Sequence, residues 1–382
     1  MYRCLKHCHL EERNEEMGKI GLPELSIIFR KKAITAIERS ERGIVLLLLN
    51  DSTNSASAGI TAYGSLLDVN KDDWSAKNYR YLQYVFKGKP YKVLAVRGVL
   101  KGDAVDVSAS KKLFSCLKYD WFAFPECTSE DATALASFFD KAKKENQKKW
   151  KAVLPNIAAD SPAVVNFTTK NISILWDEST GVETVCTAEY TARIAGLLAG
   201  TSLTQSSTYK VLDEVVDAEM LEESEVNSRI GDGELILFFD GEKFKIARGV
   251  TSLQTVTETE PEDFKKIKIV EASDLYRTDI LDTFKDYYVG NNNNTYDNKM
   301  AFIGAVRTYT AGLGGTVVDK DAGYSVDLDT EAIKQYIIAD GKDPLEMEDM
   351  EIRKYKTGSH LPIVANVMFL DAMEDLNMTV NM

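Results

Sequence analysis

Short apolar runs alternate with a helical pattern through the middle of the chain, and this alternation constrains the fold more than any other feature. The runs, each long enough for one buried strand, are Val93–Val96, Trp121–Phe124, Ala152–Leu154 and Ile172–Leu175. Between the second and third runs, Thr128 and Asp131 have the spacing of a capping box, which predicts the start of a helix. The following residues that share one face of this helix are Leu135, Phe138, Phe139 and Ala142. Strands that alternate with helices predict a sheet with helices packed on it, so we expect an α/β fold with a central domain over residues 91–260.

The chain is too long for one ordinary hydrophobic core. Its 382 residues predict several domains. Ile44–Leu49 is a buried-strand pattern followed by turn signals, which favours a small, mainly β domain over residues 36–90. After Pro261 the pattern changes again, and we expect an α+β domain over 261–382 that includes a helix from Ser273. Just before this boundary, Asp240-Gly241 between two apolar runs predicts a hairpin.

The beginning of the chain lacks any periodic pattern. Residues 1–16 precede Met17, and we expect them to be a disordered leader in front of the natural start. The spacing of Cys4, Cys8 and His9 is compatible with metal binding, but no complementary ligand pair lies nearby, so the leader interpretation is favoured. Residues 17–35 then contain a short strand pattern with Leu25, Ile27 and Phe29 on one face.

The last residues form a second strand pattern. Leu376, Met378 and Val380 alternate strictly with polar residues up to the end of the sequence, after an earlier strand pattern at Ile363–Phe369. Exposed edge strands are normally protected by charge, proline or a bulge, and residues 376–382 contain no charge and no proline. Two interpretations stay open: the terminal strands pair within the chain, or they add to the sheet of a neighbouring subunit. The second interpretation would make the protein a link in a polymer.

Composition excludes several classes of function. The net charge of −13 argues against broad nucleic-acid binding, and the longest apolar run is too short to cross a membrane. Only three histidines occur, one of them after residue 10, which leaves little material for a catalytic triad or a zinc site. No phosphate-binding loop and no dinucleotide fingerprint is present. We therefore expect no enzyme activity, no cofactor and no metal.

Three stretches resemble the tail sheath family of contractile phages and phage-tail-like bacteriocins, especially the short sheaths of Gram-positive phages and defective prophages. They are Glu38–Val45, Ala247–Leu253 and Asp371–Val380. The resemblance implies a small β-sandwich, a central domain like the subtilisin fold without its triad, and a C-terminal domain with extended terminal arms. It places Leu25, Ile27 and Phe29 in one arm, and Leu376, Met378 and Val380 in the other.

The resemblance also implies a mechanism and partners. Subunits would form stacked hexameric rings around an inner tail tube protein, attached to baseplate and tail terminator proteins. They would assemble in the cytoplasm of the bacterial host and become part of a virion tail or a released particle. Contraction from a metastable extended state would drive the tube through a cell envelope. The arms would bend at hinges, with Thr35, Gly358 and Pro362 as candidates. The alternatives are another virion or cytoplasmic polymer and, less favoured, a hydrolase.

Overall fold

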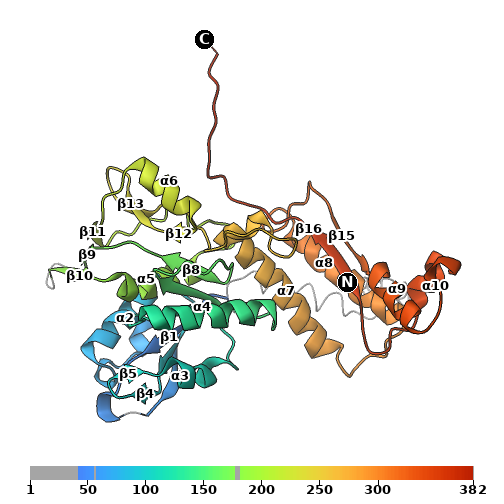
Figure 1. Ribbon diagram of the computed structural model, residues 1–382, viewed down its shortest axis with the longest axis horizontal. Coiled ribbons are helices and arrows are strands. Elements are labelled where there is room, and N and C mark those ends of the chain that lie inside the picture. Colours follow the sequence, from blue (N-terminus) through green and yellow to red (C-terminus); the bar gives the residue numbers. More distant parts are fainter. Residues whose placement is uncertain (1–41, 56, 177–180, 382) are drawn as a thin grey trace, which may run out of the picture.

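A seven-stranded sheet lies at the centre of the protein (Figure 1). The computed structural model describes residues 42–55, 57–176 and 181–381. In spatial order the strands are β12 (Glu234–Leu235), β8 (Val164–Phe167), β7 (Lys151–Pro155), β6 (Trp121–Ala123), β1 (Ile44–Leu49), β3 (Lys92–Arg97) and β2 (Gly59–Tyr63). Neighbouring strands are parallel except β2, which runs antiparallel to β3 at one edge.

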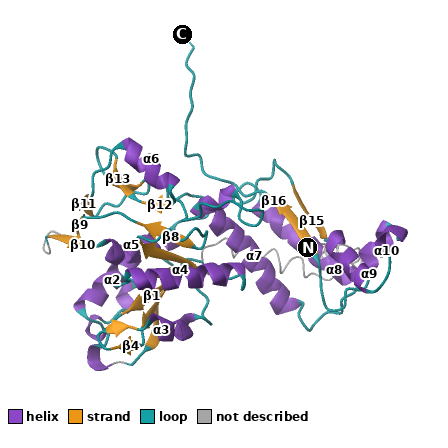
Figure 2. Cartoon of the chain, in the orientation of Figure 1, coloured by secondary structure: helices purple, strands orange, loops and turns teal. Residues whose placement is uncertain are grey.

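Helices cover both faces of this sheet (Figure 2). On one face lie α2 (Ala76–Lys87) and α5 (Thr187–Gly200); on the other lie α3 (Val107–Phe114) and α4 (Ser129–Lys144). Side chains of β1 alternate between the two cores: Val45 and Leu47 belong to the first, and Leu46 to the second. Because a parallel sheet is buried on both faces, its central strand can be apolar at every position.

Smaller β elements extend the central body. Strands β9 (Ile172–Leu175), β10 (Val182–Val185) and β11 (Val215–Asp217) form a three-stranded antiparallel sheet. The predicted hairpin is confirmed as β13 (Leu237–Phe239) and β14 (Phe244–Ile246). The body is completed by β4 (Leu100–Lys101), β5 (Ala104–Val105) and α6 (Glu223–Gly231).

The C-terminal residues form a separate lobe with its own core. Helix α7 (Ile267–Tyr287) runs from the central body to this lobe (Figure 1). The lobe contains α8 (Tyr296–Leu313), α9 (Thr330–Ala339), α10 (Asp349–Lys354) and a two-stranded sheet of β15 (Tyr324–Leu328) and β16 (Ile363–Val367). The α+β character expected after Pro261 is therefore present.

The predicted small β-sandwich over residues 36–90 is wrong for the part of the chain that the structure describes. Strands β1 and β2 belong to the central sheet, and residues 76–87 are helical. The physical reason is that β1 pairs in parallel with β3 on one side and with β6 on the other, so it cannot belong to a separate sheet. The kinship of the central domain to the subtilisin fold stays a prediction.

Candidate assembly site

The chain leaves the C-terminal lobe at the end of β16. Beyond this strand, Phe369 forms a single bridge with Val318, and the backbone N–H of Leu370 donates to the carbonyl of Val317 at 2.8 Å. After Leu370, no backbone hydrogen bond joins residues 371–381 to the rest of the described chain. In Figure 1 the end of this segment extends away from the body as an isolated stretch of chain.

Three acidic side chains hold the first part of this segment, residues 371–375, against the body. Asp371 pairs with Lys266 at the start of α7. Glu374 accepts a hydrogen bond from the Nε of Arg248 at 3.1 Å, and Asp375 accepts one from an Nη of the same guanidinium at 2.5 Å. The two carboxylates accept from two different nitrogens of one guanidinium, and such charge-assisted bonds are stronger than hydrogen bonds between neutral groups.

The second part of the segment, residues 376–381, is exposed at every position. Leu376, Met378 and Val380 are 86%, 74% and 67% exposed. We call residues 376–381 the arm. Sequence alone predicted a strand here; the structure assigns none, because no described residue offers the arm a partner strand. Among the described residues, β16 pairs with β15 and the arm pairs with no strand.

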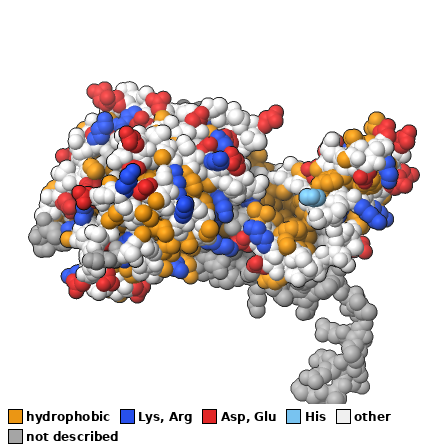
Figure 3. Space-filling model, turned by 60° about the horizontal axis from the view of Figure 1, so that its bottom comes forward, with side chains coloured by type: hydrophobic (Ala, Val, Ile, Leu, Met, Phe, Trp, Pro, Cys, Tyr) orange, Lys and Arg blue, Asp and Glu red, His pale blue; other side chains and the backbone are white. Residues whose placement is uncertain are grey.

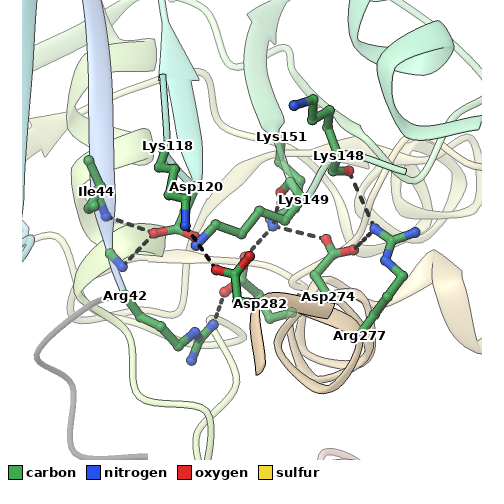
Figure 4. Close-up of polar contacts among 12 residues, drawn as sticks. Arg42, Ile44, Lys118, Asp120, Lys148, Lys149, Lys151, Asp274, Arg277 and Asp282 are labelled. Carbon is green, nitrogen blue, oxygen red and sulfur yellow. Dashed lines mark hydrogen bonds and ion pairs between the residues drawn. The ribbon is translucent and has the colours of Figure 1, made fainter. Parts of the chain in front are cut away.

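A buried charge cluster ties α7, and with it the C-terminal lobe, to the central sheet (Figure 4). Lys151, the first residue of β7, is buried and lies 2.8 Å from Glu271 and 3.1 Å from Asp274. Asp274 also pairs with Lys143 at 2.8 Å and with Arg277 at 3.0 Å. These contacts join α7 to two segments that precede it by more than one hundred residues, the end of α4 and the start of β7.

Asp120, just before β6, anchors the other side of the cluster. Its Oδ2 accepts the backbone N–H groups of Gly43 and Ile44, each at 2.9 Å, and its Oδ1 lies 2.7 Å from the ammonium of Lys149. Burial raises the pKa of Asp120, but Lys149 and neighbouring cations outweigh burial and hold the pKa below its ordinary value. Beside it, Arg42 pairs with Glu271, so the stretch before β1 is fixed to α7 as well.

The structure places the remaining predicted residues as follows. Gly358 and Pro362 lie in the loop that precedes β16, and Gly358 has a positive φ of 60°. Leu25, Ile27, Phe29 and Thr35 lie outside the described residues, as do Cys4, Cys8 and His9. Sequence reasoning missed the buried cluster, although the position of Asp120 and Lys151 directly before or at the start of predicted strands was a usable signal.

Two further properties concern the described residues only. They contain no group of three or more His, Cys, Asp or Glu side chains placed to hold a metal ion. None of their helices combines the length and the apolar character needed to cross a membrane.

Comparison with known proteins decides the family. Residues 103–252 match the model of the phage tail sheath protein central domain. The tail sheath protein of Clostridium phage phiCD119 is 33% identical over 374 residues, which cover 95% of this chain and 99% of that protein. The chain belongs to the tail sheath family. It is thus a structural subunit of a contractile tail.

Solved sheath structures share the fold of this family member. The sheath tail protein of Listeria innocua has a TM-score of 0.67 at 18% identity, with 81% of this chain and 93% of that one covered. The contracted helical sheath of the anti-feeding prophage has a TM-score of 0.66 at 14% identity, with 90% and 93% covered. At these identities the likeness concerns the fold alone. In both comparisons the likeness covers more than four fifths of this chain.

Proposed function

We propose that this sheath subunit polymerises as stacked hexameric rings around an inner tail tube and contracts to drive the tube through a cell envelope. Assembly would take place in the host cytoplasm, with baseplate and tail terminator proteins at the two ends of the tube. One observation carries the proposal: the arm is a strand pattern without a strand partner among the residues that the structure describes. An uncharged alternating segment that is exposed in the subunit is suited to pairing with another copy.

The β16 edge of the β15–β16 sheet, to which no strand of the described residues is added, is the acceptor that we propose for the arm. A two-stranded sheet is marginal by itself and gains stability from a third strand. Strand β16 contains no charged residue and no proline, so nothing in its sequence protects the free edge. Val364 is 40% exposed on this strand. An arm from a neighbouring subunit would cover such side chains with Leu376, Met378 or Val380.

The surface of the lobes is compatible with contacts between copies. Figure 3 shows acidic and basic side chains interspersed on one face, with apolar side chains gathered where the two lobes meet. Apolar surface on a subunit marks sites of protein–protein contact. The second arm of the family, predicted around Leu25, Ile27 and Phe29, belongs to the same proposal.

A pair of matched charge variants tests the arm. Met378→Asp with Val380→Asp places two charges on its apolar face, whereas Asn377→Asp with Thr379→Asp places two charges on its polar face. Burial of each large apolar side chain contributes about 1.5–3 kcal/mol, so we expect the first variant to lower the extent of polymerisation at least tenfold. The second variant should change it by about threefold or less. Sedimentation velocity measures polymerisation, and circular dichroism confirms the fold.

Deletion of residues 376–382 should leave folded monomers; normal polymers from the deleted chain would contradict the proposal.

A further inference from the structure

Residues 371–375 are the fixed part of the C-terminal segment and lead directly into the free arm. We propose that they form an electrostatic latch, which sets the direction in which the arm leaves its own subunit and places its pivot between Asp375 and Leu376. This inference rests on the proposed function of the arm and adds the residues that position it.

Arg248 is the centre of the latch. It lies in the loop after β14, in one of the three stretches that resemble the sheath family, and it binds Glu374 and Asp375 in another. Two stretches separated by more than one hundred residues in sequence therefore meet at one guanidinium. The two stretches therefore act together to hold residues 374 and 375 against the body, which neither sequence shows by itself.

Glu374 is the best-held residue of the latch. Its side chain is only 7% exposed, and each of its carboxylate oxygens has a partner. Oε2 accepts from Arg248, and Oε1 accepts from the hydroxyl of Thr208 at 2.7 Å. The Thr208 hydroxyl oxygen also accepts the backbone N–H of Gly249 at 3.0 Å, so the loop that carries Arg248 is itself tied to this threonine. A buried carboxylate is stable only with such partners, because an unpaired one would be strongly disfavoured.

A second contact lies at the start of α7. Lys266 precedes the helix and pairs with Asp371, and the buried Lys268 lies in the first turn. Positive side chains near the positive end of a helix dipole are unfavourable, and the nearby carboxylates of Asp371 and Glu374 compensate for them. The latch thus joins the residues just before the arm to α7. The buried charge cluster joins the same helix to the central sheet.

Exposure rises along the last residues of the latch, and the ion pairs end with Asp375. The side chain of Glu374 is 7% exposed, that of Asp375 is 73% exposed although it still pairs with Arg248, and Leu376 beyond this last ion pair is 86% exposed. A pivot at this step would leave β16 paired with β15 while the arm turns. A hinge at Gly358 or Pro362 would move β16 together with the arm and would break the five residue pairs between Tyr324–Leu328 and Ile363–Val367. The two pivots therefore make different predictions.

Charge exchange across the latch provides the test. Arg248→Glu removes both contacts of the guanidinium, and Arg248→Glu with Glu374→Arg restores one ion pair with the charges reversed. Lys101→Glu, an exposed position on β4, is the control for the same change in net charge. Glu374→Gln is a milder variant that keeps the hydrogen bond from Thr208, and circular dichroism shows which variants fold.

Two readouts separate the latch from the arm. Chymotrypsin digestion of dilute, unassembled protein, followed by mass spectrometry, measures how accessible the backbone is after Met373. We expect Arg248→Glu to raise cleavage there at least tenfold and to slow polymerisation at least fivefold, with both effects largely reversed by the charge exchange. Wild-type behaviour of Arg248→Glu and Glu374→Gln in both readouts would overturn the latch. If deletion of residues 376–382 still blocked polymerisation in that case, the proposed function of the arm would stand without it.

Discussion

Asp274 shows how single residues join the two lobes of this sheath subunit. The side chain lies on α7, is almost completely buried, and contacts three cations: Lys143, Lys151 and Arg277. Removing one partner from such a buried set is costly because the remaining charges lose their compensation. The charge set therefore specifies where α7 lies on the sheet, and with it the placement of the C-terminal lobe.

The pH dependence of Asp274 follows from its environment. Burial alone raises its pKa, but Lys143 and Lys151 outweigh burial and hold the pKa below its ordinary value. An acid with a depressed folded pKa stabilises the protein fully above its unfolded pKa of about 3.9, and this contribution is lost as the pH falls through the folded pKa. The charge cluster should thus remain intact at neutral pH and weaken below about pH 4.

Asp274→Asn tests this contribution. We expect the variant to lose about 3 kcal/mol of unfolding free energy at pH 7, because Lys143 and Lys151 stay buried without this carboxylate. The difference from the wild type should shrink as the pH falls below about 4, where the carboxyl group of the unfolded wild-type chain becomes protonated, and should vanish only below the depressed pKa of the folded state. Thermal unfolding between pH 3 and pH 8 measures both effects. Asp103→Asn, at an exposed position, is the control; an equal loss in both variants would contradict the role of the cluster.

At the scale of elements, α2 and α5 approach each other at glycines. A Cβ atom at Gly196 in α5 would lie 2.2 Å from the carbonyl oxygen of Val85, and one at Gly200 would lie 1.8 Å from the carbonyl oxygen of Gly88. Backbone atoms cannot move aside as a flexible side chain can. The two helices that cover one face of the sheet can therefore pack only with glycine at this crossing.

Gly196→Ala tests the crossing against a matched helical glycine. Overpacking of this kind costs about 1–3 kcal/mol, and we expect a loss in that range or above it because the contact is with backbone. Gly304→Ala in α8 meets no atom within 4 Å and should stabilise the protein by about 0.5–1 kcal/mol through helix propensity. Thermal unfolding of both variants gives the sign of each effect. Similar changes in the two variants would show that the crossing does not require glycine.

Many elements could be predicted from local sequence. The apolar runs of β1 and β9 have the predicted bounds, and the helix that begins after Thr128 has the predicted capping box. These elements follow from periodicity and caps, which are local. Helix α7 starts at Ile267, six residues before the predicted start at Ser273. The prediction missed these residues because the charged side chains among them are typical of a solvated segment. Their burial depends on cations from α4 and β7, which sequence spacing does not show.

The strand pattern of the arm is local as well, and its pairing with another copy stays a prediction. Its alternation of apolar and polar residues is visible in the sequence, and the structure then shows that no described residue of the same chain pairs with it. The latch could not be predicted, since Arg248 and Glu374 meet only after the central body and the lobe are in place. The small β domain failed as a prediction because turn signals between residues 50 and 90 concealed α2 and the parallel pairing of β1.

At the scale of the whole molecule, two well-packed lobes carry an arm that neither of them buries. The central sheet and the C-terminal lobe have separate cores, and α7 with its buried charges connects them. This arrangement suits a subunit that moves as a unit while thin segments keep it linked to its neighbours. Contacts of one copy with the next that do not close on themselves generate helical tubes.

Electron microscopy of the purified chain, alone and with its inner tube protein, tests whether the arm links subunits into a contractile sheath. We predict hollow striated cylinders of two lengths and diameters, corresponding to extended and contracted sheaths, and their loss when residues 376–382 are deleted. Monodisperse globular particles in both samples, or unchanged cylinders from the deleted chain, would contradict the claim that the arm links subunits into a contractile sheath.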